Sequence, residues 1–221
     1  MAFALIHYIS LISAVALFIA TAAVGKKYAS NRNPLTLVFV IFILLFAVSM
    51  LLNFSKGFFE PAGIEDALLS KAGLSLGLIV TALFSSFLLY PLSVQYRETT
   101  KQKIILVVMA AMWLLAGYAA FILGTLEIEF TGVVDGASNF RMPMAILGVI
   151  IFESFVNIGI LLLVVLREKD PTFRTRTLIL LVGYTIFITA EMIDSIAHLA
   201  VIVPLVSMVG LLTMTYGILR E

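Results

Sequence analysis

Residues 35–52 read LTLVFVIFILLFAVSMLL, a run in which no charged residue interrupts the apolar side chains. A helix that crosses the hydrocarbon core of a bilayer needs roughly 20 predominantly apolar residues. A strand of a membrane β-barrel would instead alternate apolar and polar side chains over about ten residues. The continuous run therefore predicts a membrane-spanning helix and argues against a barrel.

The rest of the chain has the same character. Of its 221 residues, 62% are hydrophobic and 12% are charged, whereas soluble domains are about 45–50% apolar and about 25% charged. Charges and turn residues divide the chain into seven apolar segments, which predicts an all-α membrane protein: a seven-transmembrane helix bundle forming a single polytopic domain over residues 1–221. The predicted helices cover residues 2–24, 34–54, 71–94, 103–124, 143–166, 177–198 and 203–219.

The connections between these segments also carry local signals. The longest, 125–142, contains Gly132 and alternating apolar residues, which predicts a short hairpin or cap. A very tight connection is expected at 201–203, followed by Pro204 in the first turn of the last helix. An interfacial helix is expected to begin at Ile64, after a proline- and glycine-containing turn.

Lysine and arginine are distributed unevenly between the two sides of the predicted helices. By the positive-inside rule, the side rich in Lys and Arg faces the cytoplasm. The amino terminus is then outside and the carboxyl terminus cytoplasmic, as expected of a multi-pass protein of a prokaryotic plasma membrane, and the partner is the lipid bilayer with no nucleic acid implied. Eleven basic residues lie on one side and three on the other: Lys26, Lys27, Arg32, Arg97, Lys101, Lys103, Arg167, Lys169, Arg174, Arg176 and Arg220 against Lys56, Lys71 and Arg141.

Ionisable residues inside spans are informative because a charge near the bilayer centre is expensive unless it is partnered. The sixth predicted helix has three such residues at spacing i, i+3, i+7, which places them on one face. The fifth has a glutamate and an asparagine one turn apart at similar depth. We predict that they line a cavity for a ligand or a proton in the outer half of these two helices; structural packing is the alternative. The cavity residues are Glu153, Asn157, Tyr184, Glu191, Asp194 and His198.

If Glu153 and Glu191 face each other, at least one of them is expected to hold a proton at neutral pH, because two negative charges in a medium of low dielectric repel strongly. Such a pair would link proton binding to a change in helix packing. The prediction requires that both side chains reach one cavity.

Two cofactors remain open. His7, Asp194 and His198 could bind a divalent metal, since imidazole and carboxylate groups suit zinc, iron or manganese, and the two histidines could instead ligate a haem. For His7 the competing interpretation is a structural histidine near the membrane surface. Retinal is not expected, because a Schiff-base lysine is missing from residues 203–219. With no cysteine in the chain, disulfides and thiolate sites are excluded.

Small residues predict where helices approach closely. Gly73 and Gly77 have the G-x-x-x-G spacing that lets two helix backbones come together. Packing within the bundle is the favoured interpretation, and a dimer face is the alternative. Gly148 and Gly159 are further candidates for close helix approach.

The carboxyl-terminal third resembles a known membrane module. Residues 167–183 read REKDPTFRTRTLILLVG, a basic loop that leads into a helix; a tight turn, VIVP, follows at 201–204, and the chain ends in TYGILR at 215–220. Lys26 and Lys27 before the second helix fit the same layout, as does LYPL at 89–92 before the second basic loop. This layout is similar to the seven-helix amino-terminal sensor module of histidine kinases. The resemblance implies a sensory role, and because the sequence ends at Glu221 it implies output through a separate partner.

Three functions follow, and no catalytic residue is assigned for any of them. The favoured one is a non-enzymatic membrane sensory or ligand-binding protein that signals through a cytoplasmic partner or a larger membrane complex. The second is a haem- or proton-handling subunit of a membrane redox or transport complex. The third is a metal-dependent intramembrane hydrolase, which would need at least three ligands converging on one metal.

Overall fold

The computed structural model describes residues 4–61, 63–95, 99–125, 130–134, 137–140, 143–197 and 202–220, without the side chains of 95, 125, 131, 134, 137–140 and 193–197. Almost all of this is helix. The helices are α1 Leu5–Asn31, α2 Pro34–Ser55, the 3-10 helix η1 Lys56–Phe58, α3 Ile64–Gln95, α4 Thr100–Thr125, α5 Met144–Arg167, α6 Pro171–Ala197 and α7 Val203–Leu219. A two-stranded antiparallel hairpin joins α4 to α5 and consists of β1 Phe130–Val134 and β2 Ala137–Phe140.

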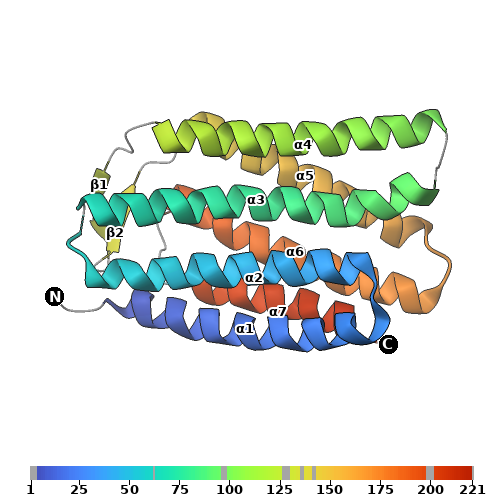
Figure 1. Ribbon diagram of the computed structural model, residues 1–221, viewed down its shortest axis with the longest axis horizontal. Helices are drawn as coiled ribbons and strands as arrows, with labels where there is room; N and C mark the ends of the chain where they lie inside the picture. Colours follow the sequence, from blue (N-terminus) through green and yellow to red (C-terminus); the bar gives the residue numbers. More distant parts are fainter. Residues whose placement is uncertain are drawn as a thin grey trace.

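The long helices run along a common axis (Figure 1), and their contacts form a closed ring. Each helix from α1 to α6 packs against the next, and α7 closes the ring by packing against both α6 and α1. A further contact joins α3 to α5, so α4 is held from one side, mainly by α3. This arrangement makes α3, α5 and α6 neighbours in the interior.

The turn between α1 and α2 follows directly from its sequence, NRNP. Arg32 adopts the left-handed conformation (φ 51°) that commonly ends a helix, and its N–H donates to the Tyr28 carbonyl. The Asn33 side chain then accepts from Leu35 N at 2.9 Å and caps α2, with Pro34 at the first helical position. Two residues are therefore enough to reverse the chain.

The turn between α5 and α6 is built in the same way. Glu168 Oε1 accepts from the N–H groups of Lys169 and Asp170, and Asp170 Oδ1 accepts from Thr172 N at 2.9 Å. Asp170 thus caps a helix that begins at Pro171. The expected start at residue 177 is therefore too late. The helix begins at Pro171, directly after the cap, and its first turns lie before the apolar segment.

Two other helices are longer than their apolar segments. The first continues past residue 24 to Asn31, and the third begins at Ile64 rather than at residue 71. The expected interfacial helix at Ile64 is therefore the first part of α3. Glu65 and Asp66 occupy its first turn, where negative charge interacts favourably with the helix dipole. The hairpin and the early position of Pro204 are confirmed. The connection expected at 201–203 falls partly outside the described residues and stays a prediction.

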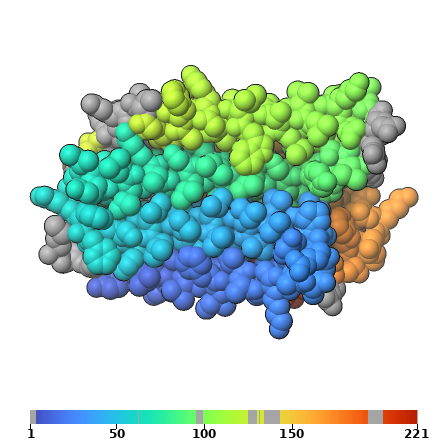
Figure 2. Space-filling model, in the orientation of Figure 1, coloured from blue at the N-terminus to red at the C-terminus, as the bar shows by residue number. Residues whose placement is uncertain are grey.

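The outer surface of the bundle is apolar. Figure 2 shows one face of the bundle, formed mainly by α1 to α4. Large apolar side chains of these helices are exposed, including Ile19, Val107 and Phe121 at 66–68%. Glu153 and Asn157, by contrast, are fully buried. Apolar residues outside and polar residues inside are what a bilayer requires and what water would penalise. Six helices, α1 to α6, are long and apolar enough to cross a membrane, and α7 is a shorter apolar helix. The protein is a helical membrane bundle.

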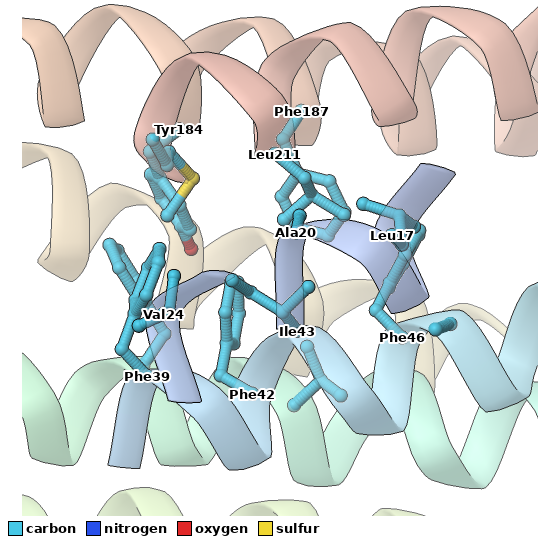
Figure 3. Close-up of a cluster of buried hydrophobic side chains, with 14 of the residues drawn as sticks. Leu17, Ala20, Val24, Phe39, Phe42, Ile43, Phe46, Tyr184, Phe187 and Leu211 are labelled. Atoms are coloured by element: carbon cyan, nitrogen blue, oxygen red, sulfur yellow. The ribbon is translucent and has the colours of Figure 1, made fainter. Parts of the chain in front are cut away.

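Aromatic rings fill much of the interior. The Phe84 ring lies 5.2 Å from that of Phe42 and stacks on Tyr184 at 4.4 Å, while Phe46 meets Phe187 edge-on at 5.0 Å. Figure 3 shows the labelled members of this core, contributed by α1, α2, α6 and α7, turned toward one another. Such ring pairs stabilise a core beyond the area they bury. They connect α2, α3 and α6 to one another.

Helices α6 and α7 approach each other closely at two glycines. A Cβ built on Gly183 would lie 2.7 Å from the Gly210 carbonyl oxygen, and one built on Gly210 would lie equally close to Gly183 O. Only glycine fits at either position. Four other glycines were expected to permit close approach. A Cβ built on Gly73 would lie 3.7 Å from Ser49 Oγ, whereas one built on Gly77, Gly148 or Gly159 would meet no atom within 4 Å. The expectation for Gly148 and Gly159 is therefore wrong.

Candidate functional site

Glu153 is the buried carboxyl at the centre of the candidate site. At about 1.5 Å per residue it lies about 14 Å along α5 from the start at Met144, well inside the span. Its Oε2 accepts from the Thr81 hydroxyl of α3 at 2.5 Å. Thr81 Oγ1 also lies 2.9 Å from the Leu78 carbonyl oxygen, one turn back on its own helix. The single hydroxyl proton of Thr81 therefore has two acceptors.

One turn further along α5, Asn157 joins the same region to α6. Its Nδ2 donates to the Tyr184 hydroxyl at 2.9 Å, and both residues are fully buried. The Tyr184 hydroxyl also interacts with the side chain of Ser154, which in turn donates to the Ile150 carbonyl at 2.6 Å. The Tyr184 hydroxyl is thus held by two residues of α5.

These residues form what we call the α3–α5–α6 polar cluster: Thr81, Glu153, Ser154, Asn157 and Tyr184. Two of its atoms, Glu153 Oε1 and Asn157 Oδ1, are buried with no hydrogen-bond partner. Both are acceptors. Most buried polar atoms in folded proteins have a partner, and in a bilayer no water is at hand to supply one. The cluster is therefore short of hydrogen-bond donors.

Glu191 lies elsewhere in the bundle. Its Oε1 accepts from the Ser207 hydroxyl of α7 at 2.7 Å. Nearby on the same side of the ring, Ser13 of α1 donates to the Pro204 carbonyl at 3.2 Å. Glu153 thus bonds to α3 and Glu191 to α7. Of the predicted cavity residues, the structure brings together Glu153, Asn157 and Tyr184.

The predicted metal or haem ligands are only partly described. His7 is buried at the start of α1, where its Nδ1 accepts from Ala4 N at 3.2 Å and the charges of Lys56 and Asp66 act on it. Lys56 and Asp66 form an ion pair at 3.5 Å. The side chain of Asp194 and the whole of His198 lie outside the described residues. Within the described part of the chain, no three His, Asp or Glu side chains are grouped closely enough to hold a metal.

Sequence reasoning missed the partners of the predicted residues. Thr81, Ser154 and Ser207 are hydroxyl residues inside spans, a type common in ordinary helix packing. One signal could have identified the first of them: Thr81 and Ser85 are one turn apart and give α3 a short polar face, and both are buried.

Comparisons of the chain with models of protein families, with curated proteins and with solved structures find no match. The function is therefore inferred from the residues of this chain and their contacts.

Proposed function

We propose that the protein is a non-enzymatic sensory or ligand-binding protein of the cell membrane, with its amino terminus outside and its carboxyl terminus in the cytoplasm. The orientation is supported by charge. The α1–α2 and α5–α6 turns, the start of α4 and the end of α7 lie at one end of the bundle (Figure 1). Of the twelve Lys and Arg residues that the structure describes, this end carries ten. Positive charge of this kind is retained in the cytoplasm.

One observation carries the sensory role: the α3–α5–α6 polar cluster joins three helices within the span and is incomplete. Hydrogen bonds between transmembrane helices contribute only about 0.6 kcal/mol each on average. A cluster with two unpaired acceptors therefore adds little to a fixed structure. A ligand that completed it would favour one arrangement of the three helices over another, which is how binding shifts a conformational equilibrium.

A signal from the cluster could reach the cytoplasmic end through α6 and α7. The two helices touch backbone to backbone at Gly183 and Gly210, and the Ser207–Glu191 hydrogen bond joins them nearer the outer end. At the inner end Lys27 Nζ donates to the Ile218 carbonyl of α7 at 2.9 Å. A movement of α6 would thus move α7, and a cytoplasmic partner would detect it. This role agrees with the resemblance to the sensor module of histidine kinases.

The proposal is tested by measuring a distance between the cytoplasmic ends of two helices. The chain contains no cysteine, so Thr100→Cys and Thr172→Cys, both exposed, can carry spin labels at the starts of α4 and α6. In nanodiscs, pH, monovalent cations, divalent cations and haem are varied in turn. We expect one of them to change the label-to-label distance, and the change to be absent when Glu153→Gln is added. A distance that responds to none of them would reject the sensory role.

A proton-handling or haem-binding subunit of a redox or transport complex is the second candidate, and a buried carboxyl within a span is the observation in its favour. The absorption spectrum of the purified protein separates the haem form of this candidate from the sensor. A Soret band that disappears in His7→Ala would support haem binding and contradict a simple receptor. The third candidate, a metal-dependent hydrolase, would require bound metal that is lost in Asp194→Ala.

A further inference from the structure

The donors and acceptors around Glu153 can be counted. The carboxyl has one oxygen facing Thr81 and one with no partner, and the nearby Asn157 Oδ1 has none either. The only donor facing the carboxyl from α3 is the Thr81 hydroxyl, which the Leu78 carbonyl also attracts. An ionised glutamate is purely an acceptor, whereas a protonated one gains a donor. One added proton would remove the shortage.

The candidate acceptor for that proton is Asn157 Oδ1, one turn further along α5. Residues four apart on a helix lie about 5–6 Å apart at their Cβ atoms, and side chains tilt toward the helix amino terminus. Asn157 therefore leans back toward Glu153. One N–H of its amide donates to Tyr184, and its Oδ1, which has no partner, can accept from the carboxylic acid.

No fixed positive charge is available to balance an ionised Glu153. On α3 there is no ionisable residue between Lys71 and Tyr90, and on α4 there is none between Lys103 and Tyr118. On α5 Glu153 is the only ionisable residue before Arg167, and on α6 Tyr184 is the only one between Arg176 and Glu191. Every element packed against Glu153 is thus neutral at its level. An unpaired buried charge is strongly destabilising.

We propose that Glu153 binds a proton and, as a neutral carboxylic acid, donates it to Asn157 Oδ1, so that the proton is the ligand that completes the α3–α5–α6 polar cluster. This rests on the proposed sensory role and names its ligand. Release of the proton leaves a carboxylate on α5, which must be hydrated or neutralised. The helices around it then have to separate or admit water, and this is the conformational change that is sensed.

Infrared difference spectroscopy in nanodiscs tests the proton directly. We expect the wild type to show the carbonyl stretch of a protonated carboxyl group and Glu153→Gln to lose that band. In Asn157→Leu the band should remain but move toward the position of a carboxyl group with no acceptor. Glutamine keeps the size of glutamate and supplies an N–H donor, so the variant should fold; helix content and elution volume check this.

Thermal stability gives an independent measurement. A glutamate in the unfolded chain ionises readily in water, so a proton held in the folded state stabilises it at low pH, and this stabilisation is lost as the pH rises. We expect the melting temperature of the wild type to fall relative to that of Glu153→Gln as the pH is raised. The other ionisable groups are common to both proteins and cancel in the difference.

Two outcomes would overturn the proton proposal. One is a spectrum in which Glu153→Gln removes no band of a protonated carboxyl. The other is stabilisation by sodium or potassium that is lost in Glu153→Gln, which would make the cluster a cation site. Either result leaves the sensory role intact if the spin-label distance still responds to a ligand. If Glu153 is protonated but the spin-label distance responds to no ligand, the sensory role is rejected and the proton proposal stands.

Discussion

Tyr184 connects the apolar and polar parts of the interior. Its ring is stacked on Phe84, and its hydroxyl lies between Asn157 and Ser154. A phenylalanine could keep the stacking but would take away the acceptor of the Asn157 amide. A change at this residue can therefore measure the hydrogen bond from Asn157 separately from the ring stacking on Phe84.

We expect Tyr184→Phe to lower the free energy of unfolding by about 1–3 kcal/mol, the typical effect of leaving a buried polar group unpaired. Adding Asn157→Leu should recover part of this loss, because the orphaned amide is then removed as well. Unfolding in mixed detergent micelles measures both values. Tyr118→Phe is the matched control, since that side chain is 64% exposed and its change should be near zero. Equal losses at positions 184 and 118 would show that the Asn157 bond contributes nothing.

At the same scale, the sequence predicts some members of the cluster and not others. Glu153 and Asn157 could be identified because a carboxyl or amide inside a span needs a reason to be there. Their partners could not, since the rotation of α3 and α6 about their own axes decides which hydroxyl they meet. The rotation of α6 about its axis also decides that Glu191 accepts a hydrogen bond from Ser207 of α7.

Among the elements, the α6–α7 pair depends most on individual residues. Gly183 and Gly210 lie at the crossing point, where the atoms that a methyl group would strike include backbone atoms. Backbone cannot rotate away as a side chain can, so the helices would have to move apart. The proposed path from the cluster to the cytoplasm passes through this contact.

Gly210→Ala is therefore expected to destabilise the bundle by about 1–3 kcal/mol, the usual range for an overpacked contact, and to loosen α7. Hydrogen exchange of α7 and the free energy of unfolding are the measurements. Gly159→Ala provides the control, because a Cβ at this position meets nothing within 4 Å and alanine favours helix more than glycine does. It should be neutral or slightly stabilising. A Gly210→Ala protein as stable as the Gly159→Ala protein would argue against a tight crossing.

This contact shows the limit of pattern reasoning at the level of elements. The spacing of Gly73 and Gly77 matched a known motif, yet only Gly73 faces another helix. Gly183 and Gly210 are single glycines on different helices, and no spacing within one helix marks them. Helix ends do not follow the apolar segments either, because Asp170 caps α6 and Gly63 immediately precedes α3, both outside the expected spans.

At the scale of the whole molecule, the number and order of the helices could be read from hydropathy, because in lipid each span must satisfy its own backbone hydrogen bonds. The closed ring and the α3–α5 contact could not, since they depend on which faces pack together. The shortest helix, α7, has 17 residues and is about 25 Å long. A hydrocarbon core is about 30 Å thick, and about 17 residues is the lower limit for a span.

Cysteine labelling tests whether α7 crosses the membrane and in which direction. Four single substitutions at exposed positions suffice: Glu60→Cys, Thr172→Cys, Ile202→Cys and Arg220→Cys. We expect a membrane-impermeant maleimide to label positions 60 and 202 in intact cells, and 172 and 220 only after permeabilisation. Three helices separate position 60 from 172, and α7 alone separates 202 from 220, so the second pair isolates the short helix. A bilayer that thins locally around α7 would accommodate the shortfall in length. Labelling of 202 and 220 from the same side would mean that α7 does not cross the membrane. If 172 and 220 were labelled in intact cells and 60 and 202 only after permeabilisation, the orientation would be the reverse of the proposed one.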